Sequence, residues 1–165
     1  MRSASIQRVV AVACVAVLGL GVALPARAAE GRLSAALARV LADQPPAEVD
    51  LARVTPFAWE EMFIFEPQSS REENCKVLDL GWIDCRLTLP AKVGANEHFL
   101  VFRRKQQIIR SEPHARTNGD FGVGSRGRPQ PVLRADARFA VVTLGRSSQE
   151  SVPAYRLDFL GAASP

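Results

Sequence analysis

The stretch from Met62 to Phe65 constrains the fold of this chain more than any other feature, because four consecutive residues there are large and apolar. Side chains alternate between the two faces of a β-strand, so a strand with this sequence is apolar on both faces. Such a strand is stable in the middle of a layered structure, where other elements pack on each side. The rest of the chain must therefore supply neighbouring strands and covering elements.

Two helices and several further strands are predicted around that central strand. One stripe at helical spacing is formed by Leu33, Leu37, Val40 and Leu41. Ser70 followed by Glu73 has the form of a capping box, which predicts a second helix. Strands are expected over 83–89, 99–102, 108–109, 138–145 and 151–161, with a hairpin turn at 104–106. These elements predict an α+β fold, an antiparallel sheet of about 5–6 strands with two helices packed on one side.

The first 28 residues have the three regions of a secretory signal peptide. Arg2 and Arg8 precede an unbroken apolar run of 16 residues, and Ala26 to Ala28 has the small-x-small form of a cleavage site. The run is shorter than the roughly 20 residues that span a bilayer, and it continues well beyond Cys14, unlike a lipoprotein signal. We therefore expect cleavage after Ala28, no stable membrane insertion afterwards, and a periplasmic or secreted protein.

Cleavage would leave residues 29–165 as one domain with a nearly balanced charge. This part keeps 18 basic and 17 acidic residues, so the pI near 9.4 of the whole chain does not indicate a nucleic-acid binder. The charge is nevertheless uneven, because residues 29–85 hold 11 acidic and 5 basic side chains and residues 86–165 hold 6 and 13. Such asymmetry indicates either an interface with a partner or two halves that pair with each other.

Two cysteines remain after cleavage, Cys75 and Cys85. In an exported protein such a pair predicts a disulfide, and the short loop that it closes would add roughly 2.5–3 kcal/mol of stability. Because odd-numbered positions from 83 to 89 are apolar, that segment is predicted to be a half-buried strand. We expect the bond to join this strand to the helix that begins after Ser70.

The stretch from Gly119 to Pro129 contains three short patterns with unrelated associations. Its G-x-G-x-x-G glycines would have to lead into a helix, which the two prolines after Gly127 prevent. Its Asp-Phe-Gly triplet belongs to a much longer kinase domain, and its Arg-Gly-Arg-Pro core of an AT-hook does not fit a near-neutral exported chain. We interpret residues 115–131 as a long Gly/Pro/Arg loop, and long loops often carry function. The candidate contact residues on it are Arg116, Asp120, Arg126 and Arg128.

No motif for catalysis, a metal or a cofactor is recognised, so none is expected. One arrangement deserves mention as an alternative: if the central strand extends back to Trp59, a carboxylate lies among aromatic side chains, where its pKa would be raised. The residues of this candidate pocket are Trp59, Glu60, Glu61 and Phe63, with His98 or His114 as a possible base. More often a glutamate in the position of Glu61 ends in water or on an arginine.

Residues 50–67 resemble a family of small exported bacterial proteins and lipoproteins. Asp50-Leu51, Phe57, Trp59-Glu60 and Phe63 to Phe65 match its aspartate-leucine start and its F-x-W-[DE]-x-x-[FY]-[IV]-F-x-P motif. Glu66 and Gln68 depart from the glycine and tyrosine that the family tends to have. The resemblance implies an α+β fold and an envelope location, and no activity comes with it.

Taken together, these features predict a small exported interaction protein that acts by binding rather than catalysis, as an inhibitor, immunity protein or assembly factor does. Its expected partner is another envelope or secreted protein, not nucleic acid. One alternative is a small-ligand binder or hydrolase-type enzyme that uses Glu60 or Glu61 with a histidine. Another is a structural component of the envelope.

Overall fold

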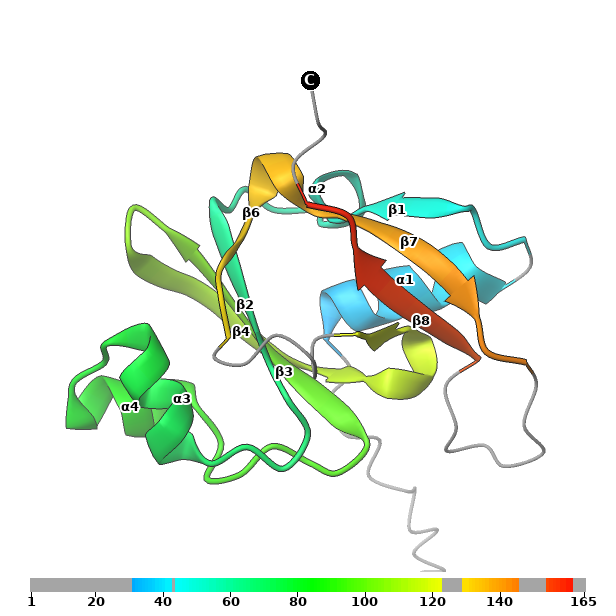
Figure 1. Ribbon diagram of the computed structural model, residues 1–165. Coiled ribbons are helices and arrows are strands. Elements are labelled where there is room, and N and C mark those ends of the chain that lie inside the picture. The colour runs from blue at the N-terminus through cyan, green and yellow to red at the C-terminus, as the bar shows by residue number, and fades with distance from the viewer. Residues whose placement is uncertain (1–30, 43, 123–128, 146–153, 162–165) are drawn as a thin grey trace, which may run out of the picture.

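A computed structural model describes residues 31–42, 44–122, 129–145 and 154–161 (Figure 1). The predicted signal peptide, residues 1–28, and the predicted contact residues Arg126 and Arg128 lie outside the described residues. Among the residues described, no helix is long and apolar enough to cross a membrane. The predicted α+β class is confirmed, but the strands form two sheets instead of one.

Each sheet has four strands, and the described helices include four α-helices. Sheet A has the strand order β1-β7-β8-β5 and sheet B the order β4-β3-β2-β6. All pairings are antiparallel except that of β5 with β8. In chain order the elements are α1 (Arg32–Ala42), β1 (Glu48–Asp50), α2 (Leu51–Val54), β2 (Glu61–Phe65), α3 (Arg71–Leu78), α4 (Trp82–Thr88), β3 (Glu97–Arg104), β4 (Gln107–Ala115), η1 (Arg116–Asn118), β5 (Asp120–Phe121), β6 (Val132–Leu133), η2 (Arg134–Asp136), β7 (Arg138–Thr143) and β8 (Tyr155–Phe159).

The main core lies between the two sheets. Met62 of β2 and Phe102 of β3 pack in one cluster with Phe139 of β7 and Leu157 of β8. The leucine stripe predicted for the first helix belongs to the same cluster, so α1 closes this core, and the helix packs beside β4 and η1. Val40, expected on that stripe, is instead partly exposed.

A second core covers the opposite face of sheet B. Phe63 and Phe65 of β2 pack there with Cys75 and Leu78 of α3 and with Cys85 of α4. The prediction that β2 is covered on both faces is therefore confirmed. The predicted grouping of Trp59 with Phe63 on one strand face is wrong, because β2 begins only at Glu61 and Trp59 packs in the main core.

The hairpin of β3 and β4 has the turn that its sequence predicts. Lys105 and Gln106 have φ of 48° and 63°, so both central residues lie in the left-handed region, as a two-residue turn between twisted strands requires. The pairing places His98 directly opposite His114 near the far end of the hairpin. This register brings two titratable side chains together that the sequence separates by 16 residues.

The segment from Trp82 to Thr88 is a helix, α4, and the predicted strand over 83–89 is wrong. The alternation that suggested a strand also fits a helix, because Cys85 and Leu89 are four residues apart and share one face. Ile83 and Leu87 have the same spacing and share the opposite face. The predicted disulfide between Cys75 and Cys85 is present, but it joins two helices.

Candidate functional site

The two helices α3 and α4 form a compact excursion from sheet B, and Figure 1 shows it at one side of the molecule. Its neck is closed by two backbone hydrogen bonds, from the Arg71 amide to the Ala91 carbonyl at 3.1 Å and from the Val93 amide to the Ser69 carbonyl at 3.0 Å. The Arg71 side chain donates to the Leu89 carbonyl at 2.9 Å. The hydrogen bonds of the neck hold the two ends of the excursion together, and the disulfide links α3 to α4 in its middle.

The start of α3 is fixed by the predicted capping box. The Glu73 amide donates to the Ser70 hydroxyl at 3.3 Å, and the Glu73 carboxylate accepts from the Ser70 amide at 3.1 Å. Hydrogen bonds with Ser70 lower the pKa of Glu73 accordingly. The cap sets the direction of α3, and through the disulfide it also sets the position of α4.

The outer side of α4 carries an exposed apolar surface, which we call the α4 face: Trp82, Ile83 and Leu87, whose exposed fractions are 71%, 63% and 82%. The Arg86 guanidinium lies 5.2 Å from the Trp82 ring centroid, in a cation–π contact. Short helices normally turn their apolar side to the core. Here Cys85 and Leu89 already serve the core, so the α4 face is additional apolar surface in water.

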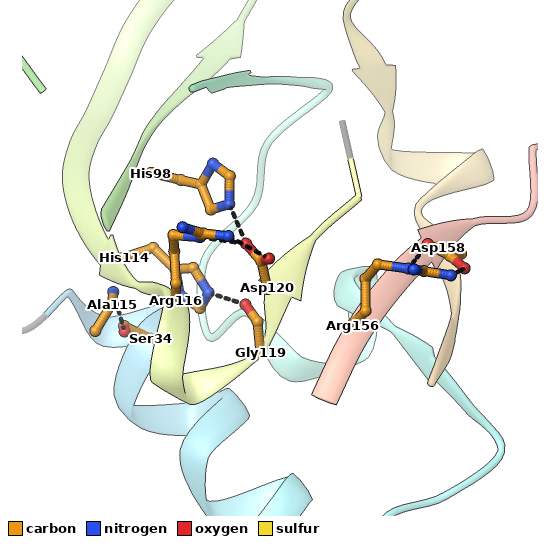
Figure 2. Close-up of polar contacts among 9 residues, drawn as sticks. All are labelled: Ser34, His98, His114, Ala115, Arg116, Gly119, Asp120, Arg156 and Asp158. Carbon is orange, nitrogen blue, oxygen red and sulfur yellow. Dashed lines mark hydrogen bonds and ion pairs between the residues drawn. The ribbon is translucent and has the colours of Figure 1, made fainter. Parts of the chain in front are cut away.

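A second cluster lies inside the molecule, where β3, β4 and β5 meet (Figure 2). His98 Nε2 donates to Asp120 Oδ1 at 2.9 Å, and Arg116 donates two hydrogen bonds of 2.7 Å to the same carboxylate. His114 Nε2 donates to the Gly119 carbonyl at 2.7 Å. The two histidines are only 2% and 0% exposed.

Burial affects the pKa of Asp120 and the pKa of His114 in this cluster. Burial alone would raise the pKa of Asp120, but the hydrogen bonds from Arg116 and His98 outweigh it and hold that pKa well below its usual range. Burial lowers the pKa of His114 to about 4. Nδ1 of each histidine is buried and has no hydrogen-bond partner among the described residues.

These contacts change the role of two predicted loop residues. Arg116 lies in η1 and Asp120 in β5, so this part of the predicted loop over 115–131 is ordered secondary structure. Their ion pair serves the interior of the protein, since its carboxylate also holds the buried His98. Arg116 and Asp120 therefore have a structural role at the junction of β3, η1 and β5.

The predicted pocket around Trp59 does not form. Trp59 is buried and its indole donates to the Thr55 hydroxyl at 2.7 Å, while Arg134 lies over its ring at 5.4 Å. Glu61 is opposite Arg103, 3.9 Å from its Nε, and His98 lies five residues further along β3. Carboxylate and histidine therefore do not converge, which removes the geometric basis of the enzyme alternative.

Glu60 and Phe63, the other two residues of that predicted pocket, also have structural roles. The exposed Glu60 carboxylate accepts from the Lys105 amide at 2.7 Å and so holds the turn of the β3–β4 hairpin. Phe63 is buried in the second core, with Arg103 over its ring at 5.5 Å.

The described surface also has hollows and ion pairs away from the α4 face. One hollow of about 340 Å³ lies along α3, with Asn74 and Val77 in its wall, and one of about 530 Å³ lies beside β1, with Glu48 and Arg138 in its wall. Within the described part of the chain no three His, Cys, Asp or Glu side chains are placed to hold a metal ion. The ion pairs of Glu48 with Arg138 and Glu61 with Arg103 join the acidic and basic halves.

Comparison with known proteins finds no matching family model, curated protein or solved structure. The candidate site therefore rests on the structure alone. Of the features described, the α4 face is open to a partner, whereas the histidine cluster is closed to solvent. The sequence contained a signal for the α4 face, the apolar pairs four residues apart, but the alternating pattern hid it.

Proposed function

We propose that this protein is an exported binding protein that captures another protein through the α4 face. The observation that carries the proposal is the exposure of Trp82, Ile83 and Leu87 on one short helix. Large exposed apolar surfaces on soluble proteins commonly mark interaction sites. Burying one such side chain is worth about 1.5–3 kcal/mol, so three of them can supply the central part of a specific interface.

The composition of the face favours a protein partner. Tryptophan and arginine are the residue types most enriched at binding hot spots, and here Arg86 already stacks on Trp82. The face projects from a helix, so a matching partner would offer an apolar groove, as in other complexes where a helix lies in a groove. A carboxylate beside that groove would pair with Arg86.

The rigidity of the excursion supports the same proposal. Association is weakened by the entropy lost when flexible groups become ordered, and a preorganised surface loses less. The closed neck at Ser69 and Val93 and the disulfide between Cys75 and Cys85 hold α4 in place before any partner binds. Export would supply the oxidising surroundings that such a bond needs.

Capture of a partner tests this function. Residues 29–165, with the disulfide formed, would be immobilised and exposed to an envelope extract of the source cells, and the retained proteins identified. We expect one protein to be retained near one-to-one by the wild type and lost when Ile83 and Leu87 are both changed to Ser.

The matched control is Leu144→Ser, which removes an exposed leucine from another part of the surface and should leave retention unchanged. All variants should keep the wild-type melting temperature, because the replaced side chains are exposed. Equal retention by the wild type and the Ile83/Leu87 variant would refute the proposed use of the α4 face.

A further inference from the structure

The histidine cluster lies where the two sheets are joined through a short connection. His98 and His114 belong to sheet B, Asp120 and Phe121 belong to sheet A, and only η1 and Gly119 separate β4 from β5. Figure 2 shows both imidazoles pointing toward the Gly119–Asp120 segment. We call residues 114–121 the corner. Its side-chain contacts hold one sheet to the other.

The corner is fixed by a small set of contacts. Phe121 packs against both imidazoles, with ring centroids 5.8 Å from His98 and 4.9 Å from His114, and against Phe139 at 5.3 Å. The hydrogen bonds of His98 with Asp120 and of His114 with Gly119 complete the set. Separation of the corner would therefore expose Phe121, which is now buried in the main core.

The two histidines differ in the groups that lie beside their imidazole nitrogens. A carbonyl oxygen can only accept, so neutral His114 carries its proton on Nε2 and leaves Nδ1 bare. That Nδ1 is buried without a partner, so a proton there would bring an unpaired N–H and a positive charge into the interior. His98, in contrast, has the Asp120 carboxylate directly beside its Nε2.

The groups around His114 offset such a charge only in part, since Asp120 and the Gly119 carbonyl favour the protonated form but burial outweighs them. The Asp120 carboxylate of β5 already accepts from Arg116 of η1 and from His98 of β3. Glu112 of β4 is paired with Arg110 and accepts from the Leu33 amide of α1, and Asp158 of β8 is paired with Arg156. A positive charge on His98 would oppose a second one on His114, since the two rings stack with centroids 6.4 Å apart.

We propose that the corner is an acid-opened latch: when His114 takes up a proton, residues 116–121 separate from sheet B while the middle of each sheet stays folded. The low pKa of His114, about 4 in the folded protein, gives the direction of the effect. Because the opened form binds the proton more readily, opening becomes easier as the pH falls below the ordinary histidine pKa of about 6.5. This inference does not depend on the proposed binding function.

Native-state hydrogen exchange of residues 29–165 tests the latch. The reporters are the Arg116 amide, bonded to the Asn96 carbonyl, and the Gly119 amide, bonded to the Arg116 carbonyl. Between pH 7 and pH 5 we expect their protection factors to fall roughly thirtyfold, since each pH unit below about 6.5 gives a factor of ten. Low urea should not change this exchange, because a local opening exposes little surface, whereas amides in the middle of β2 and β3 should respond to urea.

Two variants show which histidine causes the fall in amide protection. His114→Gln can still donate to Gly119 but cannot take a second proton, so its fall in protection should be several-fold smaller. His98→Gln is the matched control and should keep the wild-type dependence. Should His114→Gln not fold, an NMR titration of the wild-type His114 imidazole replaces it, and a pKa at or above 6.5 would overturn the proposal.

The exchange data can also refute the latch directly. Reporter amides that show the same protection and the same urea response as β2 and β3 would mean that the corner opens only when the whole protein unfolds. A fall in protection that persists in His114→Gln would mean that another group senses the acid. Either result ends the proposal.

Discussion

His98 and Asp120 are 22 residues apart in the sequence, yet His98 Nε2 lies 2.9 Å from Asp120 Oδ1 in the interior. The carboxylate therefore satisfies one buried imidazole and one guanidinium at the same time, since Arg116 also donates to it. A single side chain links β3, η1 and β5. The junction of the two sheets should depend on its charge.

Asp120→Asn should lower the free energy of unfolding by about 2–3 kcal/mol, because two charge-assisted hydrogen bonds are lost or weakened in a mostly buried place. Urea unfolding at pH 7, followed by circular dichroism, measures the change. Asp158→Asn is the control, since its ion pair with Arg156 is largely exposed and should contribute less. Equal losses in the two variants would contradict the structural role of Asp120.

The dependence of stability on pH should show two separate acid windows. The folded pKa of His114 is lowered, so the unfolded chain binds the proton first and stability falls as the pH drops from about 6.5 to about 4, by about 3 kcal/mol. The folded pKa of Asp120 is also lowered, so its contribution is complete above the ordinary aspartate pKa and is lost only at lower pH. Urea curves from pH 8 to pH 3 measure both windows.

His114→Gln and Asp120→Asn show which residue causes each of the two declines in stability. His114→Gln should remove the decline between pH 6.5 and pH 4 and leave the one at lower pH. Asp120→Asn should reduce the second decline. A wild-type protein with constant stability from pH 7 to pH 4.5 would contradict the buried neutral state of His114.

Replacing Cys75 and Cys85 by Ser should cost roughly 2.5–3 kcal/mol, as expected for a short closed loop. The effect should be concentrated in α3 and α4, because the sheets have their own core. Iodide quenching gives a local readout, since Trp82 is exposed and Trp59 is buried. In the wild type only one tryptophan should be quenched, and Trp82→Ser should abolish that fraction; quenching of Trp59 in the double Ser variant would mean that the main core is affected as well.

Gly119→Ala should destabilise the protein by about 1–3 kcal/mol. Gly119 has φ of +116°, and a Cβ there would lie 3.0 Å from side-chain carbons of Leu41 and Leu157. Gly81→Ala is the matched control, because Gly81 has an ordinary φ of −61° and nothing lies within 4 Å of an added Cβ. Thermal unfolding of the two variants measures the difference, and similar melting temperatures would argue against the strained turn at Gly119.

The features that could be predicted from the sequence depend on neighbouring residues. The capping box at Ser70, the turn at Lys105 and the doubly apolar strand after Glu61 all depend on residues within a few positions of one another. The disulfide was predictable because only one pair of cysteines remains after the proposed cleavage.

The features that could not be predicted depend on contacts between distant segments, or on a spacing of apolar residues that fits a strand as well as a helix. The pairing of His98 with His114 follows from strand register, and the approach of Asp120 follows from the way two sheets meet. The spacing of the apolar residues in α4 fits a strand and a helix equally well. Which apolar side of α4 is covered depends on where α3 lies. The apolar pairs four residues apart therefore indicate the α4 face only once the segment is known to be a helix.

The closed neck of the α3–α4 excursion has a consequence for how this protein can change over time. The chain leaves sheet B after Phe65 and returns at Glu97, and between these points the Val93 amide donates to the Ser69 carbonyl. Inside this neck the inner side chains of α3 and α4 pack on β2, whereas the exposed ones on α4 make no contribution to that core, so we expect the exposed ones to be exchangeable without shifting the register of β2 against β3. The scaffold and the surface that it presents are thus separate units of variation, and new recognition properties can arise on α4 without any need to redesign the sheets.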